Sequence, residues 1–161
     1  MATDAEIEGK FWSALKSAPN LMLGLDGARD GHTQPMTAQF EGEHGPIWFF
    51  TTKDNTLVAA LGASHRAIAS YTGKGHDLFA TLHGTVTIDN DAATIDRLWS
   101  KEIEAWYPAG KADPSLTLLR LDPDKSTFWL NGSSIGAAIS KLFGNDPKEG
   151  YKDNMATVAL A

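Results

Sequence analysis

Three β-prone segments decide the fold of this chain: NLMLGL at residues 20–25, TQPMTAQF at 33–40 and PIWFFTT at 46–52. The stretches between them, DGARDGH and EGEHG, are rich in turn-forming residues and have the length of hairpin loops. The pattern predicts three consecutive antiparallel strands.

One helix is expected before these strands and another directly after them. Apolar residues recur at three-and-four spacing over 4–17, and Thr3 with Glu6 fits a capping box, so this segment is predicted to be an amphipathic helix. After the third strand, Asp54 and Asn55 can accept hydrogen bonds from the first backbone amides of a short helix. The chain is therefore expected to turn a strand-to-helix corner here.

The next part of the chain returns to strand patterns and then to a helix. Strands are predicted over 66–72 and 77–88, the second with a bulge at Gly84. Apolar spacing then predicts a single helix over 91–106.

The C-terminal part is predicted to contain two strands, at 116–122 and 126–131, on either side of a DPDK turn. A short helix at 134–144 and a polar tail follow. Many short strands with few helices favour a small antiparallel barrel of the α+β, mainly β class over a doubly wound sheet.

Composition fits one domain over residues 1–161, with its core at about 6–130 and a C-terminal helix and tail over 131–161. The net charge of −6, from 14 basic and 20 acidic residues, argues against a nucleic-acid-binding surface. The absence of cysteine excludes disulfides and thiolate metal sites. No signal-peptide pattern or apolar run of membrane-spanning length is present, so a cytoplasmic protein is expected.

The segment from Trp48 to Thr56 carries the clearest binding signal. Its strand ends in the hydroxyls of Thr51 and Thr52, the ammonium of Lys53 and a helix start, which could converge on a phosphate monoester. The alternative is a strand and a well-capped helix with a solvated lysine.

Other residue types give weaker signals. The five histidines lack the spacing of a zinc site, and no GxSxG elbow places a serine nucleophile. His83 fits either a barrel position or a donor to a pocket. Trp106 and Trp129 stand beside predicted loops or strand ends, where they could stack on a flat ring or pack in the core. No metal site is expected, and no catalytic residue is assigned.

An ordered set of segments resembles the general stress protein branch of the pyridoxamine 5′-phosphate oxidase-like family. The resemblance runs from about residue 6 to 129 and rests on QPM at 34–36, IWFFT at 47–51, LW at 98–99, AWYPAGKADP at 105–114, LLRL at 118–121 and FW at 128–129. The segment at 105–114 is the most distinctive of these.

The resemblance implies an FMN-binding split barrel of six or so antiparallel strands with peripheral helices, forming a homodimer with flavin at the subunit interface. It places the second strand along the isoalloxazine edge and the phosphate at the end of the third strand and the following turn. The implied cofactor-binding residues are Gln34, Pro35, Met36, Thr37, Phe50, Thr51, Thr52, Lys53, Asn55, Thr56, Trp106, Lys111 and Trp129.

Two positions depart from the family pattern. Relatives often have arginine where this chain has Gln34, and a basic residue where it has Thr56 and Leu57. Lys53 is the expected substitute for the missing positive charge, because its flexible stem could reach the same anion.

The resemblance implies a flavin-dependent oxidoreductase. Two alternatives stay open: a non-catalytic flavin carrier or sensor, and a split barrel that uses haem or a deazaflavin. The C-terminal part does not resemble the substrate-binding end of a pyridoxamine phosphate oxidase itself.

Overall fold

The first strands of the chain form where they are predicted, but the third takes a distant partner. In the computed structural model, which describes residues 3–130 and 155–160, they are β1 (Asn20–Leu25), β2 (Thr33–Thr37) and β3 (Ile47–Thr52). β1 pairs antiparallel with β2, whereas β3 pairs along its whole length with β6 (Leu116–Leu130).

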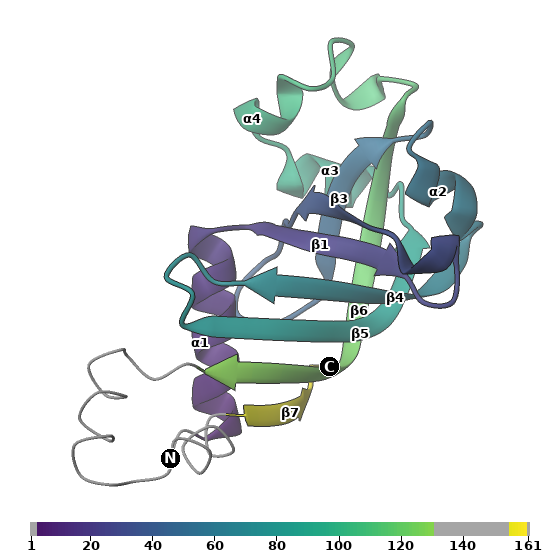
Figure 1. Cartoon of the computed structure of the whole chain (residues 1–161). Helices are drawn as coiled ribbons and strands as arrows, with labels where there is room; N and C mark the ends of the chain where they lie inside the picture. The colour runs from purple at the N-terminus through teal and green to yellow at the C-terminus, as the bar shows by residue number, and fades with distance from the viewer. Residues whose placement is uncertain (1–2, 131–154, 161) are drawn as a thin grey trace, which may run out of the picture.

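The sheet curls into a nearly closed antiparallel barrel (Figure 1). Its hydrogen-bonded order is β2-β1-β4-β5-β6-β3, with β4 (Ser64–Thr72) and β5 (Leu78–Ile88) in the middle. The ends of this order meet at Gln39 and Trp48, whose backbone N–H groups donate to each other's carbonyls at 2.8 and 2.7 Å. The predicted antiparallel barrel with a few helices is confirmed.

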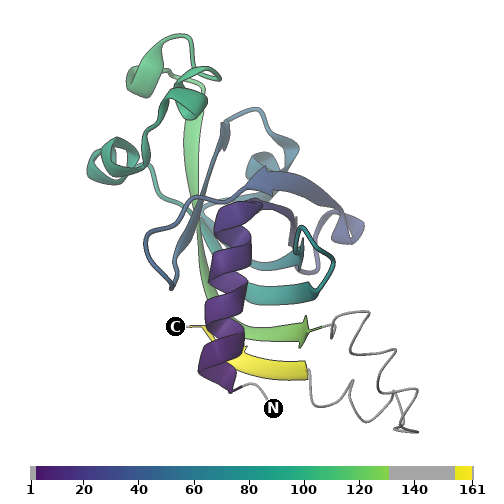
Figure 2. The ribbon, with the colours of Figure 1, turned by 90° about the vertical axis from the view of Figure 1, so that its left-hand side faces the viewer.

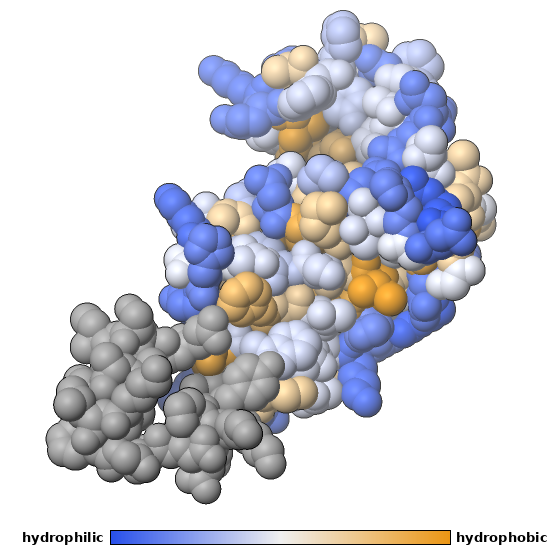
Figure 3. Space-filling model, in the orientation of Figure 1, coloured by the Kyte–Doolittle hydropathy of each residue, from blue (hydrophilic) through white to orange (hydrophobic). Residues whose placement is uncertain are grey.

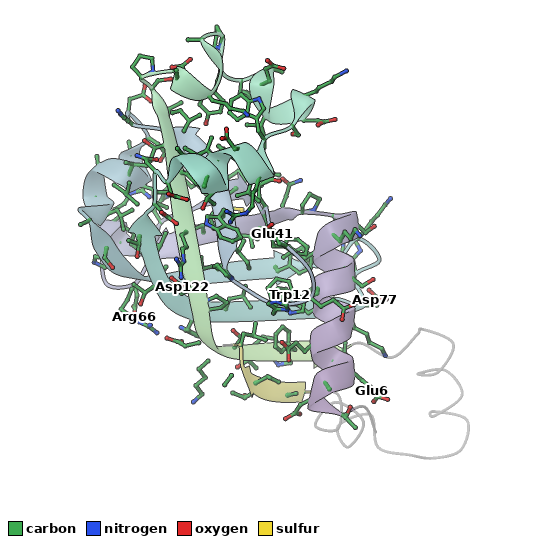
Figure 4. The ribbon with its side chains drawn as sticks, turned by 180° about the vertical axis from the view of Figure 1, so that it is seen from behind. Glu6, Trp12, Glu41, Arg66, Asp77 and Asp122 are labelled. Carbon is green, nitrogen blue, oxygen red and sulfur yellow. The ribbon has the colours of Figure 1, made fainter. Side chains whose placement is uncertain are left out.

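Helix α1 (Asp4–Ser17) lies across the strands and supplies much of the core (Figure 2). The capping box at Thr3 and Glu6 forms as predicted. Phe11 is fully buried and packs against Trp12, and Trp12 points from the helix toward the sheet (Figure 4). Phe11 also meets Phe128 of β6, with ring centroids 5.1 Å apart. The helix therefore closes one side of the barrel with aromatic side chains.

A small lobe lies beyond the barrel and contains α3 (Ala92–Leu98), α4 (Lys101–Glu104) and the 3₁₀ turn η2 (Gly110–Ala112). The single helix predicted over 91–106 is wrong, because Trp99 adopts extended backbone angles and Ser100 caps a new helix by accepting the N–H of Ile103 at 3.3 Å. The lobe packs on β3 and β6 through a second apolar cluster: Trp48, Ile95, Ile103, Tyr107, Leu116 and Leu118.

Strand β6 is one long, bent strand where two strands and a DPDK turn were predicted. Its first half pairs with β3 and its second half with β7 (Met155–Ala159), a strand that was not predicted. Pro123 lies opposite Gly84 at the predicted bulge, which a register shift after Leu82 confirms. A proline is tolerated there because a bulge leaves a backbone amide unpaired. The predicted helix at 134–144 lies outside the described residues.

Candidate functional site

Asn55 links three elements at one corner of the barrel. Its side-chain oxygen accepts the Leu57 N–H at 2.9 Å and so caps α2 (Thr56–Leu61). The same oxygen accepts the side-chain amide of Gln34 on β2 at 3.0 Å. Its amide nitrogen donates to the hydroxyl of Thr51, at the end of β3, also at 3.0 Å. We call Gln34, Thr51, Asn55 and Thr56 together the Asn55 network.

Arg29 joins the Asn55 network from the loop between β1 and β2. It begins the 3₁₀ turn η1 (Arg29–Gly31), and its Nη2 donates to the Thr56 hydroxyl at 2.8 Å. Its Nη1 is buried and has no hydrogen-bond partner among the described residues. In Figure 1 this loop and α2 lie side by side at the right-hand edge of the barrel, where hydrophilic side chains gather in Figure 3. No pattern in the sequence points to Arg29, because it stands in a turn segment 27 residues from its partner.

Tyr107 ties the lobe to the same corner. Its hydroxyl is buried and donates to the Thr51 carbonyl at 2.6 Å. Burial raises the pKa of Tyr107 to about 12, and the nearby Asp113 carboxylate adds to the shift. Tyr107 therefore stays protonated and holds the end of β3 through a phenol hydrogen bond.

Replacing Tyr107 by Phe is expected to lower the free energy of unfolding by about 1–2 kcal/mol at pH 8, because a buried carbonyl loses its donor. The contribution is present below pH 10, the ordinary tyrosine pKa, and is lost as pH rises toward 12, because only the unfolded chain ionises in that window. Urea denaturation of both proteins at pH 8 and at pH 11 measures this difference. A gap of equal size at both pH values contradicts this role of the hydroxyl.

Asp113 shapes the loop that presents Tyr107. Its carboxylate accepts the hydroxyl of Ser115 at 2.7 Å and the backbone N–H groups of Ser115 and Ala109 at 2.9 and 3.3 Å. The hydrogen bond from the Ser115 hydroxyl is the main reason that the pKa of Asp113 is lowered. The distinctive 105–114 segment thus folds on itself and positions Tyr107 against β3.

Lys53 and Lys111 lie together on the lobe side of β3. Both line an open hollow of about 390 Å³, whose other lining residues include Ile95, Pro114 and Leu116. Lys111 is paired there with Asp96 at 2.9 Å. The contacts of the Asn55 network come instead from Gln34 and Arg29, on the β1–β2 side.

The remaining predicted residues divide between the two sides of this corner. Pro35 and Thr37 are exposed on β2, beside the buried Met36. Phe50 is half-buried and packs edge-on against Trp99 of the lobe, with ring centroids 6.0 Å apart. The Thr52 hydroxyl donates to Asp54, the other predicted helix-capping residue.

Two predicted tryptophans lie away from the Asn55 network. Trp106 is 81% exposed, on the lobe. Trp129 is half-buried near the far end of β6, opposite Phe79, whereas Thr52 pairs with Leu116 at the start of that strand. Four inter-strand steps of about 4.8 Å separate Trp129 on β6 from β2 in the order β2-β1-β4-β5-β6. One chain therefore does not bring all of the predicted residues together.

The arrangement suits an anion more than a metal ion. Arg29, Gln34 and Asn55 all carry N–H donors, and the Thr51 and Thr56 hydroxyls add to them. No group of three or more His, Asp or Glu residues within 3–130 and 155–160 is placed to hold a metal ion. None of the helices within these residues has the length and apolar character of a membrane span.

A family model described as pyridoxamine 5′-phosphate oxidase like matches residues 6–148. The chain belongs to this family. Membership agrees with the resemblance noted in the sequence and with the barrel topology.

Solved structures of the family include two similar chains from Xanthomonas. One, described as a general stress family protein of X. campestris pv. campestris, is 57% identical, with a TM-score of 0.79 over 83% of this chain and 93% of that one. The other, a general stress FMN/FAD binding protein of X. citri, is 56% identical, with a TM-score of 0.76 over 81% and 92%. Both confirm the fold over most of their length.

A curated relative is General stress protein 26 of Bacillus subtilis (strain 168), 35% identical over 48 residues. The match covers 30% of this chain and about a third (34%) of that protein's length. It supports the general stress protein branch of this family.

Proposed function

We propose that this chain binds FMN and acts as a flavin-dependent oxidoreductase. The observation that carries the proposal is the hydrogen bond from Gln34 to Asn55. It joins the strand expected along the isoalloxazine edge to the turn expected at the phosphate, so both parts of the ligand would meet one continuous polar surface. Membership of the family and the FMN/FAD-binding relative from X. citri support this proposal.

The residues at this corner fit the two ends of such a ligand. β2 ends the sheet order and pairs with β1 on one side, so over Thr33–Thr37 its other edge offers backbone donors and acceptors to a ring edge. The Asn55 network offers amide and hydroxyl donors to a phosphate. The half-buried Phe50 supplies apolar surface of the kind that a flat ring needs.

When bound, FMN supplies the oxidation–reduction chemistry. In this proposal, the chain holds the phosphate with Asn55, Thr51 and Thr56 and orients the ring along β2. Tyr107 keeps the end of β3 in place by its bond to the Thr51 carbonyl. Protein groups thus supply position and electrostatics.

The pocket is completed, in this proposal, by a second copy of the chain. Trp106 is 81% exposed, and Figure 3 shows apolar side chains in the recess between the lobe and the barrel. Trp129 is separated from the β2 strand of its own chain by four strand spacings, so in this proposal it serves the partner's site. Dilution to the monomer is then expected to release flavin, as followed by fluorescence and light scattering; flavin retained by a verified monomer contradicts the shared pocket.

The purified protein is expected to show flavin absorbance, or to quench the fluorescence of added FMN. Bleaching of the yellow band by NADH or NADPH would support turnover, whereas bound FMN that neither reduces would indicate a carrier or sensor. A haem or deazaflavin spectrum would identify that group, and not FMN, as the cofactor. A colourless protein that leaves FMN fluorescence unchanged refutes the proposal.

A further inference from the structure

We infer that Arg29 supplies the positive charge that binds the terminal phosphate of the flavin. The inference rests on the proposed function and names a residue outside the set predicted from the sequence. Its starting point is the charge at the corner: Gln34, Asn55, Thr51 and Thr56 are all neutral. A phosphate monoester carries a charge of about −1.5 to −2 at pH 7, and charge-assisted hydrogen bonds to phosphate are about twice as strong as neutral ones.

Arg29 is the one arginine of the chain without a carboxylate partner in the described residues. The sequence contains four arginines, all of them described. The other three arginines all form ion pairs: Arg66 with Asp124, Arg97 with Glu41, and Arg120 with Asp122 and Asp89. Arg29 instead donates one nitrogen to the Thr56 hydroxyl and keeps a buried Nη1 without a partner.

A partly buried guanidinium without a carboxylate partner is costly, because burial removes water from its charge and no anion in the described residues takes the place of that water. The cost is offset when an anion binds. A guanidinium presents N–H groups in a planar fork that matches two phosphate oxygens at once. One arm of the Arg29 fork is held by the hydroxyl of Thr56, the residue that follows Asn55, so the guanidinium lies at the edge of the Asn55 network.

The backbone that carries Arg29 is also unusual. Arg29 and Asp30 both adopt left-handed backbone angles, with φ of 55° and 52°. Such residues cost about 1 kcal/mol or more each and persist only where the surroundings enforce them. Here the turn is held by hydrogen bonds from Gly31 N–H to the Ala28 carbonyl at 3.1 Å and from His32 N–H to the Arg29 carbonyl at 2.9 Å. The turn with these left-handed angles holds the Arg29 guanidinium against Thr56, the first residue of α2.

The other candidate cation, Lys53, has no comparable anchoring. Its side chain is exposed and lines the hollow shared with Lys111, on the lobe side of β3. Its backbone N–H bonds to the Ser115 carbonyl at 2.9 Å, which ties this residue to the loop that follows η2. Arg29 contacts the network directly, and Lys53 does not do so through any side-chain bond in the described residues.

The test compares FMN with riboflavin, which has the same ring system and lacks the phosphate. Fluorescence titration gives the Kd of each ligand for the unmodified protein, Arg29→Gln, Lys53→Gln and Arg97→Gln. For Arg29→Gln we expect the Kd for FMN to rise about tenfold to a hundredfold, as for a lost charge-assisted contact, with riboflavin affinity changed less than about twofold. Arg97→Gln removes the same charge from a surface ion pair and should leave both affinities unchanged.

Each outcome decides between the claims. If the unmodified protein prefers FMN and Arg29→Gln keeps that preference, the inference about Arg29 fails while the proposed function stands; loss of the preference in Lys53→Gln instead assigns the phosphate to Lys53. If the unmodified protein binds neither ligand, both claims fail. Thermal melts check that each variant folds, and Arg29→Lys, which keeps the charge without the fork, should recover part of the FMN affinity.

Discussion

Replacing Asn55 by Asp is expected to weaken FMN binding at least about a hundredfold while leaving the fold intact. Aspartate caps a helix about as well as asparagine, so the bond from the Leu57 N–H is kept. The new carboxylate, however, cannot donate to Thr51 and adds a negative charge next to the proposed phosphate site. Two unit charges about 5 Å apart repel by about 3 kcal/mol at an effective dielectric constant near 20, which corresponds to more than a hundredfold in Kd. Titration with FMN and with riboflavin measures the effect.

A matched control exists at Asn90, just after β5, whose side-chain oxygen accepts the Leu118 N–H at 2.7 Å. Asn90→Asp makes the same chemical change, can keep this contact and lies outside the residues proposed to bind FMN, so its FMN affinity should stay within about twofold of the unmodified protein's. Riboflavin affinity should change little in either variant. Equal FMN affinity for Asn55→Asp and the unmodified protein would remove Asn55 from the phosphate site.

Local patterns were sufficient to locate most of the elements of the barrel. The capping box at Thr3, the cap at Asn55 and the bulge at Gly84 each depend on residues close in sequence, and each forms as predicted. The DPDK segment shows the limit of such patterns, because the same residues form a turn when exposed and a bend when paired. Here β6 has partners on both sides of Pro123, and the strand continues through the bend.

The candidate site likewise combines a contact between residues close in sequence with contacts between residues far apart in sequence. Thr51 and Asn55 are four residues apart, and their contact lies within the strand-to-helix corner predicted from the sequence. Arg29 and Tyr107 reach that corner from 27 and 56 residues away, which no local pattern reveals. Relatives often carry a positive charge at position 34, where this chain has the neutral Gln34, which donates to Asn55. The guanidinium of Arg29 instead reaches the adjacent Thr56.

The bend in β6 connects this site to the rest of the barrel. Before the bend, β6 pairs with β3, which ends at Thr51 and Thr52; after it, β6 packs Phe128 against Phe11 of α1. The bend is possible because Gly84 of β5 lets the backbone of Asp122 and Pro123 approach closely. A change at Gly84 should therefore alter the global stability and not one loop alone.

Replacing Gly84 by Ala is expected to destabilise the fold by about 3 kcal/mol or more, near the upper range for overpacking. A Cβ at this position would overlap the Asp122 carbonyl oxygen and lie 2.9 Å from Pro123 Cα, and both are backbone atoms that cannot move aside as a flexible side chain would. Urea denaturation followed by tryptophan fluorescence measures the change. Gly9→Ala is the matched control: a Cβ there meets nothing within 4 Å, and removing a helical glycine should stabilise α1 by about 0.5–1 kcal/mol. If the two variants unfold at the same urea concentration, the bend in β6 does not depend on the missing side chain.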